Sequence, residues 1–175
     1  MLLDNPDVVS WILDEPKVKT KMEEDLWGKG LIRDAPDKQW TNKFGESLCR
    51  EIYENILHKR VWRPVKLNGY QPDWETDDEI IEVKTGTYFT KGTAHEKVLG
   101  CPFKYAEIPR LYSKPLVIVC LGGAERRCRN LYGNLPGPVQ ANSPEKRLFV
   151  KFFKLNRITF VGASFLLRNN HFVCP

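Results

Sequence analysis

Three side chains in one short segment have the types and spacing needed for metal-dependent chemistry. Asp73, Glu82 and Lys84 belong to a stretch with six carboxylates in ten residues, although the whole chain has a formal net charge of +5. If residues 77–78 form a two-residue turn, Asp73 lies opposite Glu82, and directly opposed side chains have Cβ atoms about 4.5–5.5 Å apart. Because side chains alternate along a strand, Glu82 and Lys84 then share a face with Asp73, while Val83 points into the core.

Two carboxylates with an amine beside them suit the hydrolysis of a phosphodiester assisted by a divalent cation. Mg²⁺ prefers oxygen ligands and keeps several waters, so we expect Asp73, Glu82 and the carbonyl of Val83 to hold it. Such a metal neutralises charge on the scissile phosphate and lowers the pKa of a bound water. Lys84 would orient or deprotonate that water.

Two simpler interpretations of the acidic segment stay open at this point. The carboxylates can keep an exposed turn soluble, or they can pair with lysines elsewhere in the chain. In either case Lys84 is an ordinary ion-pair partner, and such surface pairs contribute about 0–1 kcal/mol.

The segment also resembles a known family motif. Pro72-Asp73, followed after eight residues by Glu82-Val83-Lys84, looks like the motif of the PD-(D/E)XK nuclease superfamily. The expected order of elements around it is that of the superfamily's common core: a helix, an apolar strand carrying E-x-K, a second helix and a buried strand. Residues 92–123 are also similar to the region that follows the motif in some type II restriction endonucleases.

This resemblance covers roughly residues 40–121, and it carries implications for the site. It implies that Asp73 and Glu82 are metal ligands and that Lys84 is the catalytic lysine. Many members of the superfamily also place a glutamate from the preceding helix near the metal. Glu46 is the first candidate for that role, Glu51 and Glu54 are alternatives, and an exposed, solubilising glutamate is the simpler interpretation.

Hydrophobic periodicity predicts the elements that must position these residues. In residues 41–60 apolar side chains recur every four positions, from Phe44 to Ile56, which predicts a helix with Thr41 as its N-cap. The continuous apolar run in residues 114–123 predicts a buried central strand that ends at two glycines. Two shorter helices are expected near the N-terminus, around residues 8–13 and 17–27.

The second half of the chain follows the same alternation of helix and strand. Thr93 has capping-box spacing with Glu96 and predicts a helix start. Residues 124–143 contain Gly, Pro and Asn and predict a long loop. Ser143-Pro144 predicts a further helix, with an apolar stripe at Leu148, Phe152 and Leu155, and residues 158–167 predict a closing strand. We therefore expect one α/β domain over residues 1–175, with a restriction-endonuclease-like core and a mixed central β-sheet flanked by helices.

The distribution of positive charge indicates a polyanionic partner. Lys and Arg number 27 against 22 for Asp and Glu, and they gather in three stretches that flank the acidic segment. An arginine can contact guanine through two hydrogen bonds or bind phosphate, and the sequence does not separate these. A solvated surface is the simpler interpretation. The candidate DNA-binding residues are Lys91, Lys97, Arg126, Arg127 and Arg129.

Composition narrows the class of protein. No apolar run approaches the roughly 20 residues that span a bilayer, and the N-terminus has no charged and then apolar signal pattern. The five scattered cysteines form no C-x-x-C pair and indicate free thiols in a reducing compartment. No glycine-rich nucleotide-binding loop is present. We expect a soluble, intracellular protein in the cytoplasm, with no membrane partner.

These observations converge on one expected function. The chain is expected to be a Mg²⁺-dependent endonuclease that hydrolyses double-stranded DNA, in the manner of a sequence-specific type II restriction enzyme. A homodimer is expected, because a compact domain must pair to cut both strands of a symmetric site. The alternatives are a structure-specific repair or recombination nuclease with the same site, and a DNA-binding module without catalysis.

Overall fold

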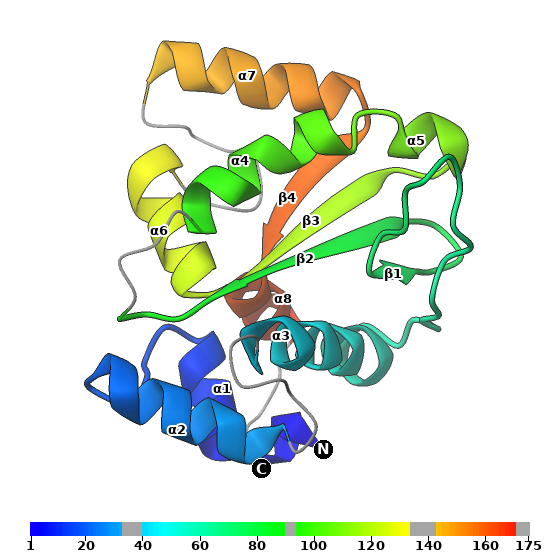
Figure 1. The fold of residues 1–175 in the computed structure, drawn as a ribbon. Coiled ribbons are helices and arrows are strands. Elements are labelled where there is room, and N and C mark those ends of the chain that lie inside the picture. The colour runs from blue at the N-terminus through cyan, green and yellow to red at the C-terminus, as the bar shows by residue number, and fades with distance from the viewer. Residues whose placement is uncertain (33–39, 90–93, 134–142, 171–175) are drawn as a thin grey trace.

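The computed structural model describes residues 1–32, 40–89, 94–133 and 143–170, and within them the chain forms an α/β fold around one mixed sheet (Figure 1). The sheet has the order β1-β2-β3-β4, in which β1 is antiparallel to β2 and the other neighbouring pairs are parallel. The mixed, helix-flanked sheet predicted from the sequence is therefore confirmed. Its strands are β1 (Trp74–Glu75), β2 (Ile80–Gly86), β3 (Leu116–Gly122) and β4 (Ile158–Gly162).

Helices cover both faces of this sheet, as the two layers in Figure 1 show. One face packs against α1 (Pro6–Ile12), α2 (Lys21–Leu31), α3 (Trp40–Glu51) and α8 (Ala163–Asn169). The other packs against α4 (Ala94–Lys104), α5 (Ile108–Leu111), α6 (Gly123–Tyr132) and α7 (Pro144–Leu155). A 3-10 turn, η1 (Leu2–Asp4), precedes α1, and a π-helical turn, η2 (Ile52–Ile56), continues α3. None of the described helices is both long and apolar enough to cross a membrane.

Alternation along β2 assigns its side chains to the two layers. Ile81 and Val83 belong to the core beneath α3, together with Phe44 and Leu48. Ile80 belongs to the opposite core, beneath α4. Since side chains alternate along a strand, Glu82 and Lys84 point to the α4 side. Strand β3 next to it is buried at every position, as the apolar run predicted for a parallel strand covered on both faces.

The helix predicted before the hairpin is confirmed as α3, with one difference at its start. Phe44, Leu48 and Ile52 are fully buried, as their spacing predicted. Thr41 is not the N-cap, because the helix already includes Trp40, which is buried against Trp27 and Phe44. The helix thus starts at a residue that packs against aromatic rings, and not after the predicted capping residue. The predicted N-terminal helices are confirmed as α1 and α2.

The long loop predicted over residues 124–143 is wrong in its first part. The chain turns at Gly122, whose φ is +57° and whose Cα lies against the Trp11 ring, and enters α6 directly. Helix α6 is mostly polar, and contacts of Glu125 and Arg129 hold it in place beside its buried Ala124 and Cys128. Residues 134–142 of the predicted loop lie outside the described residues, as does Thr93.

Two predictions about the C-terminal part also need correction. Ser143 does cap α7, accepting from the backbone N–H of Lys146 at 3.2 Å. The expected apolar stripe does not face the core, however, because the helix buries Phe153 and leaves Leu148, Phe152 and Leu155 exposed. The predicted strand over residues 158–167 is a strand only as far as Gly162, after which α8 packs under the sheet.

The cysteines of the described residues are consistent with the expected free thiols. Cys49, Cys101, Cys120 and Cys128 are buried and unbridged. Cys174 lies outside the described residues. A disulfide framework therefore does not hold the described part of this fold together.

Candidate active site at the hairpin of β1 and β2

The hairpin has the register predicted from the sequence. Trp74 pairs with Ile81 and Glu75 with Ile80. The backbone N–H of Thr76 donates to the carbonyl of Glu79 at 2.9 Å, which closes the turn over residues 77–78. This register brings the residue before β1, Asp73, to the middle of β2.

Several carboxylates of the hairpin have lysine partners from elsewhere in the chain. The Lys59 ammonium lies 2.7 Å from Glu79 and 3.0 Å from Asp78, and the Lys114 ammonium lies 2.8 Å from Glu75. Pairing with distant lysines, one of the two simpler interpretations, is therefore correct for these three acids. It does not account for Asp73 and Glu82.

The Asp73 side chain makes the hydrogen bond to Val83 that a neighbouring strand would otherwise make. Because β1 begins only at Trp74, the backbone of Val83 has no strand partner on that side, and its N–H donates to Asp73 Oδ2 at 2.7 Å. The N–H and C=O of one strand residue point to the same side, so the Val83 carbonyl faces the same edge. The Asp73 carboxylate and the Val83 carbonyl thus lie at the same edge of β2, while the neighbouring Glu82 side chain points to the α4 face.

Glu82 and Lys84 lie deeper than an exposed hairpin would allow. Glu82 is only 4% exposed, which rules out the interpretation of this residue as a solubilising acid. Its Oε1 accepts from the Lys84 ammonium at 2.5 Å. Its Oε2 is buried and has no hydrogen-bond partner among the described residues. A buried carboxylate oxygen without a partner is costly, and it is a rare feature of folded proteins.

Burial and the crowding of negative charge perturb the titration of this group of residues. Burial, followed by the charges of Glu82 and Glu46, raises the pKa of Asp73 to about 7, although the Val83 N–H opposes the shift. Burial lowers the pKa of Lys84, but the charge of Glu82, its hydrogen bond to the ammonium and the charges of nearby groups together outweigh burial, so the pKa ends above its ordinary value. Burial, then the charge of Glu82 and hydrogen bonding to its carboxylate, raise the pKa of Tyr105, which lies just after α4.

Glu46 lies beside the site, as the family resemblance implied for one helix glutamate. Its carboxylate is 2.5 Å from the Arg63 guanidinium, which also donates to the backbone carbonyl of Asp73 at 2.9 Å. Arg63 in turn lies 4.1 Å from the ring of Trp74. Glu46 is therefore held at the rim by Arg63. The two alternatives have other contacts: Glu51 accepts from the first turn of the chain and Glu54 pairs with Arg50.

The donor set fits a hard divalent cation with few protein ligands. Among the described residues, no group of three or more His, Cys, Asp and Glu side chains is arranged to hold a metal. Mg²⁺ usually takes only one or two carboxylates and keeps several waters, so a larger group is not required. Asp73 and Glu82 would supply the carboxylates, the Val83 carbonyl a third oxygen, and Glu82 Oε2 is available for a cation.

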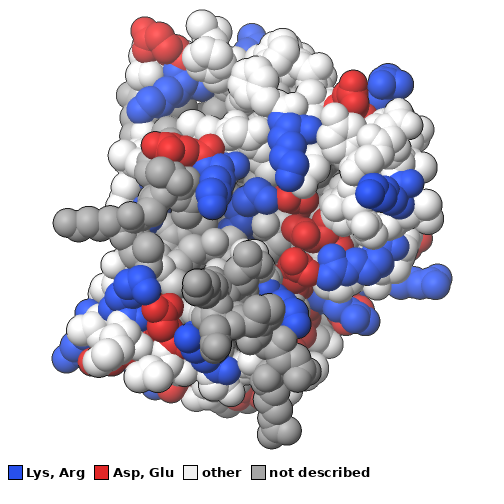
Figure 2. All heavy atoms as spheres, in the orientation of Figure 1, with Lys and Arg blue, Asp and Glu red and all other residues white. Residues whose placement is uncertain are grey.

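The charge around this site has a simple pattern. Figure 2 shows Asp and Glu side chains gathered near the middle of this face, over β2, with Lys and Arg side chains on both sides of them. An acidic centre between basic flanks is the arrangement expected where a cation and a polyanion meet. Lys97 is exposed on α4, and Lys91 lies outside the described residues.

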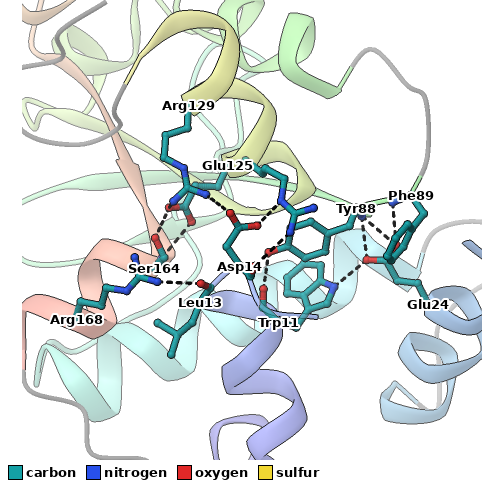
Figure 3. Close-up of polar contacts among 11 residues, drawn as sticks. Trp11, Leu13, Asp14, Glu24, Tyr88, Phe89, Glu125, Arg129, Ser164 and Arg168 are labelled. Carbon is teal, nitrogen blue, oxygen red and sulfur yellow. Dashed lines mark hydrogen bonds and ion pairs between the residues drawn. The ribbon is translucent and has the colours of Figure 1, made fainter. Parts of the chain in front are cut away.

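Two of the arginines predicted to bind DNA have structural partners. Arg126 and Arg129 both donate to the carboxylate of Asp14, in the second case at 2.6 Å. Arg129 also lies 3.8 Å from the buried carboxylate of Glu125 (Figure 3). Arg127 is half-buried on the same helix. Their role in binding DNA stays a prediction, but Arg126 and Arg129 also join α6 to the chain after α1.

The local sequence pattern did not indicate the buried carboxylates that organise this region. Glu24 is fully buried and accepts from the indole N–H of Trp11 at 2.8 Å and from the backbone N–H of Tyr88 at 2.9 Å (Figure 3). Tyr88 lies two residues after the end of β2, so Glu24 holds the segment that leaves the strand carrying Glu82 and Lys84. Arg63 and Tyr105 were missed for the same reason, because nothing in their local pattern distinguishes them from surface or core residues.

Comparison with known proteins adds no relative to this description. No family model, no curated protein and no solved structure matches the chain. The function must therefore be inferred from the geometry and chemistry of the site.

Proposed function

We propose that this protein is a Mg²⁺-dependent endonuclease that hydrolyses phosphodiester bonds of double-stranded DNA. One observation carries the proposal: Glu82 Oε2 is buried without a hydrogen-bond partner among the described residues, close enough to Asp73 for its charge to raise the pKa of that carboxyl. A divalent cation would satisfy that oxygen and relieve the repulsion between the two carboxylates. Bound there, it would supply charge neutralisation at the phosphate and a water of lowered pKa.

Lys84 has the position and charge needed to act on the phosphate. Its pKa is raised, so it keeps its proton at neutral pH. In that state it would hold a non-bridging phosphate oxygen and orient the attacking water. Acting as a base would first require the Lys84 ammonium to lose a proton to solvent, which the Glu82 carboxylate opposes because it stabilises the ammonium at 2.5 Å.

The order of elements supports a restriction-endonuclease-like core of the PD-(D/E)XK type. Helix α3, the hairpin of β1 and β2, helix α4 and the buried strand β3 follow one another in the order that the motif implies. A homodimer of the type II restriction class is part of the proposal, since one compact site cuts one strand at a time. Sedimentation of the purified protein, with and without DNA, tests this part separately.

A cleavage assay tests the proposed activity. Purified protein is incubated with phage-length DNA in Mg²⁺ or in EDTA, beside Glu82→Gln as the site variant and Asp77→Asn as a matched hairpin control. Discrete bands that require Mg²⁺ and are lost only with Glu82→Gln support a sequence-specific enzyme. Cuts confined to branched or flapped substrates would instead identify a structure-specific nuclease. Intact DNA in every lane, together with DNA binding, would leave only a non-catalytic binding module.

A further inference from the structure

Helix α7 presents an apolar surface to solvent on the side away from the hairpin. Its large side chains on this surface are 58–74% exposed, and Phe103 of α4 beside them is 74% exposed. Monomeric proteins expose apolar residues singly far more often than in such groups, and a contiguous group marks an interaction site. We call this surface the α4–α7 platform; it consists of Phe103, Leu148, Phe149, Phe152 and Leu155.

The α4 and α7 parts of the platform are joined through one buried ring, Phe153. Phe153 anchors α7 in the core, and its ring centroid lies 6.1 Å from that of Phe103 and 6.1 Å from that of Phe152. Figure 1 shows α7 running alongside α4 over the same face of the sheet. Residues 148, 149, 152 and 155 have the spacing of one helical face. A long apolar segment therefore has two helices to lie against.

Positive charge lines one edge of the platform. Helix α7 contains four basic residues and one acid, Glu145, so its net charge is +3. Lys146 donates to the Leu131 carbonyl and is turned inward. Within the described part of the chain, neither Lys151 nor Lys154 forms an ion pair, and both are exposed. This basic edge is left for an external partner.

We propose that the α4–α7 platform binds an acidic amphipathic helix of a partner protein. Apolar side chains at i, i+3, i+4 and i+7 of that helix would pack on the platform, as in other helix-in-groove complexes. Its carboxylates would face Lys151 and Lys154. Charge complementarity of this kind determines which partner binds and in which orientation, while the apolar contacts supply most of the affinity.

The same charges argue against two other occupants. A second copy of the chain would place one basic helix against another in a self-complementary contact, +3 against +3. An anionic membrane would have to accept Glu145, which lies one turn before Phe149 and two turns before Phe152 on the same face. A membrane-surface helix carries basic residues opposite its apolar face, whereas here the acid shares that face. A partner helix can place a basic residue there.

Fluorescence polarisation with designed peptides tests this proposal. The probe is a labelled helical peptide with leucines at the spacing above and glutamates along one flank, and the matched control carries lysines instead. We expect the glutamate peptide to bind at least tenfold more tightly. A Leu148→Ser/Phe152→Ser variant should lose at least tenfold in affinity, whereas Leu26→Ser, at a leucine exposed on α2, should not.

Charge reversal provides the second, independent variant. Lys151→Glu/Lys154→Glu changes only exposed side chains, so it should fold normally and prefer the lysine peptide. Equal binding of both peptides by the natural protein, or binding of neither, would overturn the proposal. So would a dimer that Phe152→Ser dissociates, or binding to phosphatidylserine-containing vesicles without binding to the glutamate peptide. The hairpin variant Asp73→Asn should bind the peptide normally, which separates this surface from the proposed nuclease site.

Discussion

At the level of single residues, the two carboxylates proposed as metal ligands have different surroundings. Glu82 is buried and paired with Lys84, whereas Asp73 is held by a backbone N–H and titrates far above its ordinary range. Sites arranged for chemistry commonly accept such a cost in stability. The consequence is that a variant can lose activity while the metal-free protein gains stability.

Asp73→Asn should show these opposite effects on activity and on metal-free stability. The amide can still accept from Val83, but it removes one of the crowded charges, so cleavage should fall by at least a hundredfold while metal-free stability at pH 8 rises. Cleavage rates and denaturant unfolding measure the two effects. Asp77→Asn, in the exposed turn of the same hairpin, should change neither. Full activity in Asp73→Asn would end the metal-site proposal.

The raised pKa of Asp73 also predicts how metal-free stability depends on pH. Between the unfolded value of 3.8 and the folded value of about 7, the folded state binds more protons than the unfolded state. Stability therefore falls as pH rises through this window, and the loss is complete above about pH 7. Denaturant unfolding from pH 4 to pH 8 in EDTA should show a decline that is smaller in Asp73→Asn. Parallel curves for the two proteins would mean that Asp73 is not the titrating group.

Lys84 should be needed for the chemical step and not for binding. Lys84→Ala should still bind DNA, yet cut far more slowly in single-turnover experiments. Lys84→Arg should not restore the rate, because a guanidinium is larger, stays protonated and must fit beneath α4 near Cys101. A binding titration on both variants provides the control. If arginine supports full cleavage, Lys84 serves only as the ion-pair partner of Glu82.

At the scale of elements, α6 is held in place by charges that were expected to face DNA. Arg129→Ala removes the ion pair with Asp14 and leaves Glu125 less compensated, although burial already raises the pKa of Glu125. We expect a loss of about 1–3 kcal/mol in the free energy of unfolding. Lys151→Ala, on the exposed side of α7, is the control for loss of one positive charge.

The same variant separates a structural role from binding to phosphate. Removing one interaction between an arginine and a phosphate lowers the slope of log affinity against log salt by about 0.9 for duplex DNA. A destabilised Arg129→Ala with an unchanged salt slope makes this arginine purely structural. A lower slope without a change in stability would restore it to the DNA-binding surface.

At the scale of the whole molecule, a metal that binds only the folded state must stabilise all of it. Mg²⁺ at about 100 times its Kd should add about 2.7 kcal/mol to the free energy of unfolding. Thermal melting with and without Mg²⁺ measures this gain, and Asp73→Asn should lose most of it. An equal gain in both proteins would place the bound cation elsewhere.

Local signals were enough to predict several parts of the protein correctly. Alternation around a two-residue turn predicted the pairing of Trp74 with Ile81, and four-residue spacing predicted that Phe44 and Leu48 face the core. A continuous apolar run predicted the buried β3. These predictions succeeded because strand alternation, helical periodicity and turn chemistry act over a few residues.

Other features depend on distant parts of the chain and could not be predicted from local signals. Glu82 is buried because α4 covers its face of the sheet, and Arg63 reaches Glu46 only because the hairpin packs beside α3. The sequence predicts a loop where α6 forms, because this helix is mostly polar and its contact with Asp14, 112 residues from Arg126, has no local signal. The stripe on α7 faces solvent, since periodicity indicates that a face is apolar but not what covers it.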